Sequence, residues 1–269
     1  WLLRRLKLFP NAYYNYLKHR KSGYLQKKKI ILGKIKEIYY KYNRLPGHRM
    51  MTIFLERAGI YLSKTTVQKY MNRILNLHAV VQRRKPLYRK GTQHKIFENL
   101  LQQDFAAVKR NQIWCTDFTY IRLLNGKMRY NCTIVDLYDR SVVASVNGKN
   151  ITAGLAITAL EMALTTAKPK RGLILHSDQG SQFTSWEFTQ FCKLRGVTQS
   201  MSKAGCPYDN APIERFYHTF KQELIYQHQF RSDDELDHAV SRYIFVWYNH
   251  LRPHTYNDYL TPFEKRFAS

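Results

Sequence analysis

The change of apolar periodicity near Asn111 is the feature that most restricts how this chain can fold. Three segments rich in strand-forming residues follow it, "IWCTDFTYIRLL", "MRYNCTIVDLY" and "RSVVASVN", and Asn125-Gly126 between the first two is typical of a two-residue hairpin turn. The pattern then predicts a helix over 153–167, a strand at "GLILH", a helix over 185–195 and a strand at "VTQSM". A meander followed by alternating helices and strands predicts an α/β fold, a mixed five-stranded sheet covered by helices, with functional residues at strand ends.

The region before Asn111 is predicted to be all-α, with helical periodicity from Leu25 to about Leu77. Within it, "GHRMMTIFLERAGIYLSKTTVQKYMNRIL" reads as two helices around a turn at Gly59, and Ser63 is the predicted N-cap of the second helix. This is the layout of a helix-turn-helix, whose second helix enters a DNA major groove. A basic helical hairpin with a solvated face remains the alternative.

The second of these helices has two distinct faces. Val67, Met71 and Ile74 recur at i, i+4 and i+7 and are its predicted buried residues. The outward-facing residues are candidate DNA contacts: Lys64, Gln68 and Arg73. The basic run that follows, "QRRKPLYRKGTQHK", is the predicted linker because it contains a proline and a glycine, and it adds two candidate phosphate contacts, Arg83 and Arg84.

The charge of the chain restricts its partners. Lys and Arg total 44 against 19 Asp and Glu in 269 residues, a formal net charge of +25. Such a surplus attracts polyanions, nucleic acid among them, although ribosomal and membrane-surface proteins share it. No apolar run approaches the ~20 residues that cross a bilayer, which predicts a soluble, cytoplasmic protein. The four cysteines form no CxxC pair, so we expect reduced thiols and no zinc site.

Three carboxylates lie where the predicted fold can bring them together. Asp117 is in the first strand, Asp178 follows the fourth, and Glu214 is near the start of the helix "APIERFYHTFKQEL". The apolar stripe of that helix leaves Glu214 and Lys221 about 100° around from it. Three converging carboxylates repel one another unless a cation lies between them, and Mg²⁺ prefers such oxygen ligands.

Each of these acids, taken alone, is more often a structural residue such as a loop cap. Their spacing changes that judgement. Asp178 and Glu214 are separated by 35 residues (179–213), and Lys221 lies roughly two helical turns beyond Glu214. In a chain with a net charge of +25, three converging acids indicate a metal site that meets the DNA backbone.

Four motifs carry a specific resemblance. They are "WCTDFTYI", "HSDQGSQF", "GCPYDNAPIERFYHTFKQE" and "YNHLRPH" followed by "TP", in order from Trp114 to Pro262. Together they closely resemble the DDE transposases of bacterial insertion sequences, the branch that shares its catalytic core with retroviral integrases. The helical segment before the core is also similar, less distinctively, to the helix-turn-helix of those transposases.

The resemblance implies an RNase H-like core in which Asp117, Asp178 and Glu214 hold two Mg²⁺ or Mn²⁺ ions. It implies cleavage of one DNA strand at the element end, exposing a 3′-OH that attacks another phosphodiester through a circular intermediate. Lys221 would contact a phosphate near the scissile bond, and a homo-oligomer would bind the terminal repeats and target in double-stranded DNA. The family also implies an upstream frame with a second helix-turn-helix and a coiled coil, and the start at Trp1 fits a chain lacking it. Unlike retroviral integrases, the sequence has no N-terminal His/Cys zinc module.

The predicted organisation has four parts. These are a helix-turn-helix region over 1–84, a basic linker over 85–110, an RNase H-like catalytic core over 111–225, and a C-terminal helix and tail packed on the core over 226–269.

Other polar residues are assigned structural roles or left open. Ser232 and Glu235 have the spacing of a capping box, with Asp233 and Asp234 as helix-start charges. The structural readings are an N-cap for Asp209-Asn210 and a turn role for Asp139. For three positions the alternatives stay open. Asp136 lies near the metal or in a turn, and His176 orients Asp178, contacts DNA or packs in the core. The segment from Arg252 to His254 contacts a phosphate or forms a helix-ending turn.

Three other functions each fit part of the sequence. A tyrosine recombinase would use His228, Arg231 and Tyr256, although 20 tyrosines make such a coincidence easy. A sequence-specific DNA-binding protein with an inactive core would not need all three carboxylates. A cellular RNase H-type nuclease fits the fold, but the basic helical region favours a protein that binds DNA ends.

Overall fold

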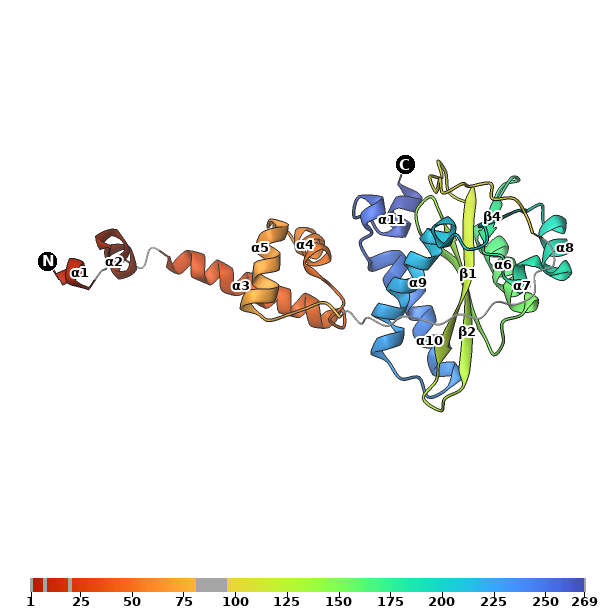
Figure 1. Cartoon of the computed structure of the whole chain (residues 1–269). Coiled ribbons are helices and arrows are strands. Elements are labelled where there is room, and N and C mark those ends of the chain that lie inside the picture. The colour runs from red at the N-terminus through yellow and green to blue at the C-terminus, as the bar shows by residue number, and fades with distance from the viewer. Residues whose placement is uncertain (1, 7–8, 19–20, 81–95, 269) are drawn as a thin grey trace. The chain divides into compact units, whose positions relative to one another are not determined.

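The computed structural model describes residues 2–6, 9–18, 21–80 and 96–268. The chain divides into two compact units, Trp1–Val80 and Val81–Ser269 (Figure 1). In the described ranges, no helix combines the length and the apolar character needed to pass through a lipid bilayer.

The first unit is all-α, and three of its helices pack together. Its elements are α1 (Leu2–Arg5), α2 (Pro10–Leu17), α3 (Ser22–Lys41), α4 (His48–Arg57), α5 (Lys64–Gln68) and the π-helical segment η1 (Lys69–Ile74). α3 packs on α4 and α4 on α5, which buries Leu55 and Val67. Gly59 in the turn has a φ of +77°, which favours glycine, and Ser63 Oγ accepts a hydrogen bond from Thr66 N at 3.2 Å. The predicted turn and N-cap are therefore confirmed.

One predicted buried residue of the second helix is wrong. Val67 and Met71 are buried, but Ile74 is 40% exposed. The cause is the transition from α5 into η1, because the i→i+5 bonding of a π-helix advances each residue by less than the 100° of an α-helix. The buried face therefore shifts, so that Tyr70 lies in the core and Ile74 points outward.

The second unit is built on the mixed five-stranded sheet that the sequence predicts. Its strands are β1 (Ile113–Arg122), β2 (Met128–Asp136), β3 (Val142–Gly148), β4 (Ile174–Ser177) and β5 (Thr198–Met201). The order is β3-β2-β1-β4-β5, in which the first three strands are antiparallel neighbours and β4 and β5 are added in parallel. β1 therefore lies at the centre, between an antiparallel and a parallel partner.

The predicted hairpin between β1 and β2 is present, but its turn is not a two-residue turn. Leu123 N donates to Lys127 O at 2.9 Å and Gly126 N to Leu123 O at 3.0 Å, which leaves three residues in the loop. Gly126 has a φ of +82°, whereas Asn125 keeps a negative φ. The two-residue type I′ turn needs positive φ at both central residues, so the longer loop forms instead.

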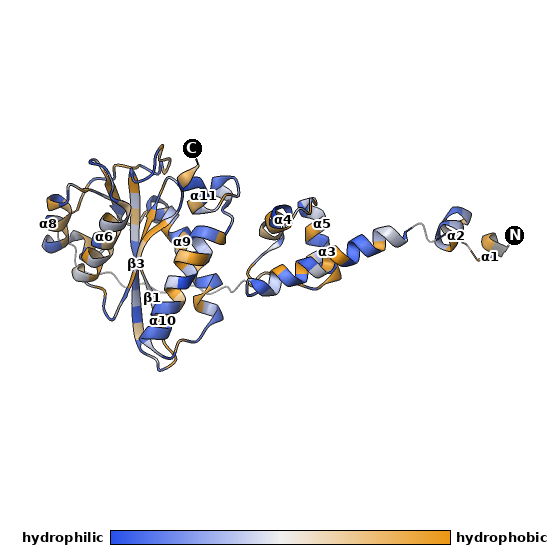
Figure 2. Ribbon diagram, turned by 180° about the vertical axis from the view of Figure 1, so that it is seen from behind, coloured by the Kyte–Doolittle hydropathy of each residue, from blue (hydrophilic) through white to orange (hydrophobic). Residues whose placement is uncertain are grey.

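Helices cover both faces of the sheet (Figure 1). One layer consists of α6 (Ala153–Ala167), α7 (Ser181–Thr184) and α8 (Trp186–Leu194), and it packs on the sheet through Leu160, Phe183 and Phe188. The other layer contains η2 (Pro207–Asn210), α9 (Ala211–Glu223), η3 (Ile225–Gln227), α10 (Asp233–Arg242), η4 (Tyr243–Leu251), η5 (Thr255–Asn257) and α11 (Pro262–Phe267). α9 carries hydrophobic residues among hydrophilic ones (Figure 2), and its predicted apolar stripe is buried: Ile213, Phe216, Tyr217, Phe220 and Leu224.

The C-terminal helices are bound to the edge of the sheet. Asn249 of η4 accepts a hydrogen bond from Val142 N and donates one to Val142 O, both at 2.9 Å, so it pairs with the edge strand β3 as a neighbouring strand would. The capping box predicted for α10 is only half formed. Ser232 Oγ accepts from Glu235 N at 3.2 Å, but the Glu235 carboxylate accepts from Arg231 N instead of Ser232 N.

Candidate active site

The sheet places Asp117 and Asp178 on neighbouring strands. β1 and β4 are parallel, and Cys115 pairs with His176 at the end of their shared register. Extending this register by two residues brings Asp117 opposite Asp178, which directly follows β4. Residues two apart on a strand share a face, and neighbouring strands are about 4.8 Å apart. The two carboxylates therefore lie on the same face of the sheet within a short distance of each other.

Glu214 reaches this face from α9. The helix packs along β1 through its apolar stripe, and Glu214, in the first turn, remains exposed. Glu214 and Asp178 both raise the pKa of Asp117 through their negative charges. The fold thus brings the three predicted carboxylates into one electrostatic cluster, centred on Asp117.

The pKa directions show the cost of this arrangement. Burial is the largest cause that raises the pKa of Asp117 well above its ordinary value, followed by the charge of Asp178, against a hydrogen bond from Phe118 N at 2.7 Å. Burial also raises the pKa of Asp178, which accepts from Gly180 N at 3.0 Å, and that of Glu214. All three acids are easier to protonate in the folded chain, so a nearby cation would relieve an unfavourable charge cluster.

Lys221 lies on α9, the helix that carries Glu214, and its charge interacts with that of Asp117. Its Nζ is 4.5 Å from the centre of the Tyr120 ring, within the range of a cation–π contact. Burial lowers the pKa of Lys221, and the charge of Asp117 opposes that effect. The Lys221 ammonium is therefore half-buried, on the Tyr120 ring and close to Asp117.

The donor chemistry of the cluster fits a hard divalent cation. Asp117 and Asp178 each accept one backbone N–H through Oδ1. In the described part of the chain, the Oδ2 atom of each has no hydrogen-bond donor. Such oxygens are the ligands that Mg²⁺ prefers. The same residues contain no group of three His, Cys, Asp or Glu side chains close enough to hold an ion. A three-carboxylate set therefore needs a side-chain adjustment, which the long, exposed Glu214 allows.

The sequence pattern missed a polar contact beneath the cluster. The Tyr217 side chain is buried in the apolar stripe of α9, yet its hydroxyl lies 2.6 Å from Asp117 O and accepts from Thr133 N at 3.0 Å. The available signal was the hydroxyl itself, because a tyrosine among buried phenylalanines requires a hydrogen-bond partner.

His176 is a packing residue. It is fully buried, with Nδ1 at 2.8 Å from Ser200 Oγ and Nε2 at 2.9 Å from Asp209 O. Burial lowers its pKa, which favours the neutral ring. His176 thus joins β4 and β5 to the turn η2 that precedes α9, and the packing alternative is the correct one.

Asp209 and Asn210 do not cap α9 through their side chains, so that prediction is wrong. Asn210 occupies the N-cap position without a side-chain cap. The Asp209 carboxylate instead accepts from Asn99 Nδ2 at 2.9 Å, Gln103 Nε2 at 2.8 Å and Lys203 N at 2.9 Å. These three donors, two of them from a segment distant in the chain, offer more than the single backbone N–H of a cap.

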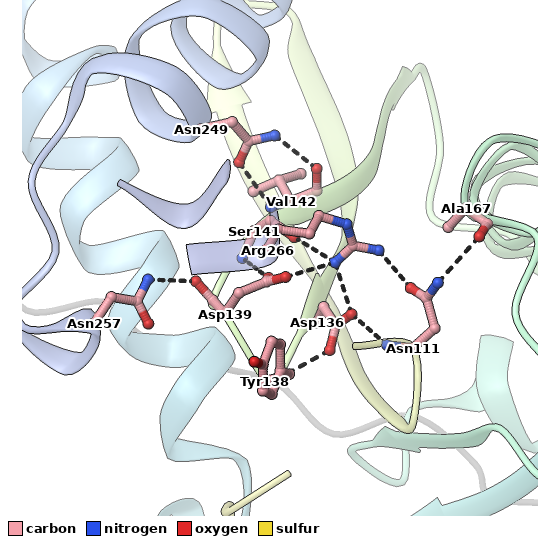
Figure 3. A network of polar contacts seen from close by, with 10 residues as sticks. All are labelled: Asn111, Asp136, Tyr138, Asp139, Ser141, Val142, Ala167, Asn249, Asn257 and Arg266. Atoms are coloured by element: carbon pink, nitrogen blue, oxygen red, sulfur yellow. Dashed lines mark hydrogen bonds and ion pairs between the residues drawn. The ribbon is translucent and has the colours of Figure 1, made fainter. Parts of the chain in front are cut away.

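Asp136 belongs to a buried network on the C-terminal side of the core (Figure 3). It accepts from Asn111 N at 2.7 Å and from Tyr138 N at 3.1 Å, and the Arg266 guanidinium of α11 contacts it at 2.9 Å. The same Arg266 Nη1 contacts Asp139 at 2.7 Å. These contacts support the structural alternative for Asp136. Asp139 also forms an ion pair with Arg266, which the sequence did not indicate.

The remaining candidates fall into two groups. Arg252 ends η4 and pairs with Glu223 of α9 at 2.9 Å in a largely buried position, which supports the structural reading of that turn. In the first unit, the predicted DNA contacts are exposed on α5 and η1: Lys64, Gln68 and Arg73. Arg83 and Arg84 lie outside the described residues.

Known proteins resemble this chain along most of its length. Two integrase core domain families match residues 107–207 and 195–262. The chain is 32% identical to the putative transposase InsK for insertion sequence element IS150 of Escherichia coli K12, over 98% of this chain and 92% of that protein. It is 34% identical to the transposase for insertion sequence element IS904 of Lactococcus lactis, over 92% of this chain and 98% of that protein.

A solved structure matches the fold. The simian T-cell lymphotropic virus intasome, solved in complex with a PP2A regulatory subunit, contains a chain with a TM-score of 0.52 and 18% identity, over 81% of this chain and 71% of that one. The likeness confirms the predicted RNase H-like fold of the integrase type.

Proposed function

Since the chain belongs to the insertion-sequence transposases with an integrase-type core, we propose that Asp117, Asp178 and Glu214 are its catalytic, metal-binding carboxylates. The observation that carries this proposal is the strand register that brings Asp117 beside Asp178, with Glu214 of α9 close enough for its charge to act on Asp117, in a chain with a net charge of +25. A fold that gathers negative charge in a basic protein, at a cost, does so where a cation is needed.

The proposed reaction has two steps on double-stranded DNA. Water attacks a phosphorus atom at the element end, the bond to the 3′-oxygen breaks, and that oxygen leaves as a 3′-OH. This hydroxyl then attacks a second phosphodiester, so that one P–O bond forms as another breaks. Bound Mg²⁺ or Mn²⁺, two ions per site, would activate the nucleophile and stabilise the leaving oxygen.

The side chains have separate tasks in this proposal. Asp117 and Asp178 supply oxygen ligands from the sheet, and Glu214 completes the set from α9. Lys221, held on Tyr120, contacts a phosphate next to the scissile bond. Because two element ends must be joined to one target, a homo-oligomer on DNA is the proposed active form. The tyrosine recombinase is not favoured, because the chain matches integrase core domains and insertion-sequence transposases.

Catalysis should require a divalent ion. We expect strand cleavage of a labelled duplex carrying the element end with Mg²⁺ or Mn²⁺ and none in excess EDTA. Ca²⁺ should support DNA binding at most, because it is larger and accepts looser coordination. Gel analysis of the cleaved strand measures this, and robust cleavage in EDTA would contradict the proposed function.

The helix-turn-helix proposal makes a separate prediction about specificity. In the full chain, the triple variant Lys64→Ala, Gln68→Ala, Arg73→Ala should lose most of its preference for element ends over random DNA, since each base contact contributes about 1–3 kcal/mol of discrimination. Competition band shifts at fixed salt measure the ratio. A matched control, Lys27→Ala with Lys36→Ala on exposed positions of α3, should weaken binding to both DNAs equally. Unchanged preference in the triple variant would refute the assignment.

A further inference from the structure

The Tyr217 hydroxyl connects the helix that carries Glu214 to the strand that carries Asp117. Tyr217 lies three residues after Glu214, in the same stretch of α9, and its side chain is 5% exposed. The hydroxyl oxygen is 2.6 Å from Asp117 O and 3.0 Å from both Thr133 N and Asn131 O. Asp117 and Thr133 are direct partners across β1 and β2, so the hydroxyl meets both strands where the catalytic aspartate sits.

The hydrogen-bond roles follow from the chemistry of a phenol. A hydroxyl has one proton, and the closer carbonyl, Asp117 O at 2.6 Å, is the better acceptor for it. The oxygen accepts in return from Thr133 N. Burial raises the pKa of Tyr217 well above its ordinary value, so the group stays protonated and is no general acid or base near neutral pH. Its contact is with the backbone of Asp117.

The other contacts of α9 are apolar packing on the core and, at its far end, the polar contacts of Glu223 with Arg252 and Tyr243. Ile213, Phe216 and Phe220 hold the helix through apolar packing, and Phe216 stacks on Phe220 with ring centroids 5.8 Å apart. Apolar packing is not directional, whereas the Tyr217 hydrogen bond is. The hydroxyl thus gives α9 a directional contact with the backbone of β1, next to the Asp117 side chain.

We propose that Tyr217 is a positioning residue, which fixes α9 on β1 so that Glu214 and Asp117 can bind the same divalent ion. The inference rests on the proposed function, because it assumes that these carboxylates are ligands. Without the hydroxyl, the position of Glu214 relative to Asp117 is no longer fixed. Part of the free energy of ion binding is then used to bring the two carboxylates back together. Removing an indirect partner of this kind lowers metal affinity by about 10–100-fold in other metal sites.

The test compares Tyr217→Phe with Tyr243→Phe in the full chain. Tyr243 is also 5% exposed, and its hydroxyl also bonds to α9, but at the far end of the helix, 3.0 Å from Glu223 Oε2. Both variants lose one buried phenolic O–H and keep the ring, so both should melt a few degrees lower without metal. The Kd for Mn²⁺ is then measured from the rise in melting temperature with Mn²⁺ concentration, and independently by titration calorimetry well below the melting temperature.

We expect Tyr217→Phe to bind Mn²⁺ at least about tenfold more weakly, and Tyr243→Phe to keep the Kd of the parent. The half-saturating Mg²⁺ concentration for strand cleavage should rise in parallel for Tyr217→Phe only. A parental Kd in Tyr217→Phe, or equal weakening in both variants, would overturn the positioning role alone. A parent chain that binds no Mn²⁺ would instead overturn the proposed function on which the role depends.

Discussion

Replacing any one of Asp117, Asp178 and Glu214 by its amide should reduce strand cleavage and 3′-OH transfer by at least several hundredfold. The change keeps the shape of the side chain but removes a negative charge that an ion needs, a loss on the order of 4 kcal/mol for a key electrostatic contact. DNA binding should persist or improve, because repulsion with phosphate falls. Cleavage and strand-transfer assays on labelled element ends, with band shifts on the same DNA, measure both quantities.

The folding of these variants can be checked through the same charges. Each acid has a raised pKa in the folded chain, so its protonated form favours folding at low pH. This contribution to the free energy of unfolding is lost as pH rises through the folded-state pKa, and above it the buried negative charge is the penalty of the folded state. At neutral pH and without metal, an amide removes this penalty. The variants should therefore melt no lower than the parent in EDTA, which excludes unfolding as the cause of lost activity.

Asp234→Asn is the appropriate control for the triad. Asp234 is exposed in the first turn of α10, where its charge is worth about 0.3–1 kcal/mol, so activity should be nearly unchanged. Asp233 looks equivalent in the sequence, but it pairs with Arg129 of β2 at 2.8 Å and is unsuitable. If Asp178→Asn retained strand transfer while Asp234→Asn lost it, the assignment of the catalytic carboxylates would be wrong.

Arg266→Met should lower the free energy of unfolding by about 3–5 kcal/mol, the cost of leaving buried charges without their partner. Asp136 and Asp139 are both fully buried, and Arg266 Nη1 contacts them at 2.9 and 2.7 Å (Figure 3). Arg266 Nη2 also donates to Asn111 Oδ1 at 2.6 Å, so the side chain ties α11 to the start of the core. Urea unfolding of the full chain, followed by circular dichroism, measures the loss.

Two further variants isolate the role of the charge. Lys265→Met, on the neighbouring residue of α11, removes a cation 5.6 Å from the Tyr138 ring and should cost less than about 1 kcal/mol. Adding Asp136→Asn and Asp139→Asn to Arg266→Met should recover part of the stability. Burial, and then the charge of Asp139, raises the pKa of Asp136, so the penalty in Arg266→Met should also shrink as pH falls. Equal losses in the Arg266 and Lys265 variants would contradict this account.

Local chemistry made several features predictable from the sequence. Ser63 caps α5 because a hydroxyl can reach the N–H three residues on, and the apolar stripe of α9 is buried because its spacing matches the helical repeat. The order of strands and helices likewise indicated the mixed sheet. Asp117, Asp178 and Glu214 could be selected because their spacing and flanking motifs resemble those of a family, and their role as ligands stays a prediction.

The sequence by itself determined the strands of the core, the family and the candidate acids, since these depend on residue type and short-range spacing. Only the tertiary structure decided which residues meet across the fold. The placement of β4 beside β1 makes Asp178 a neighbour of Asp117, and docking of α9 brings the Tyr217 hydroxyl to the Asp117 backbone. Arg266 finds Asp136 in the same way. A hydrogen bond or ion pair between residues distant in the chain leaves no periodic signal, because its energy depends on distance and direction in space and not on separation in sequence.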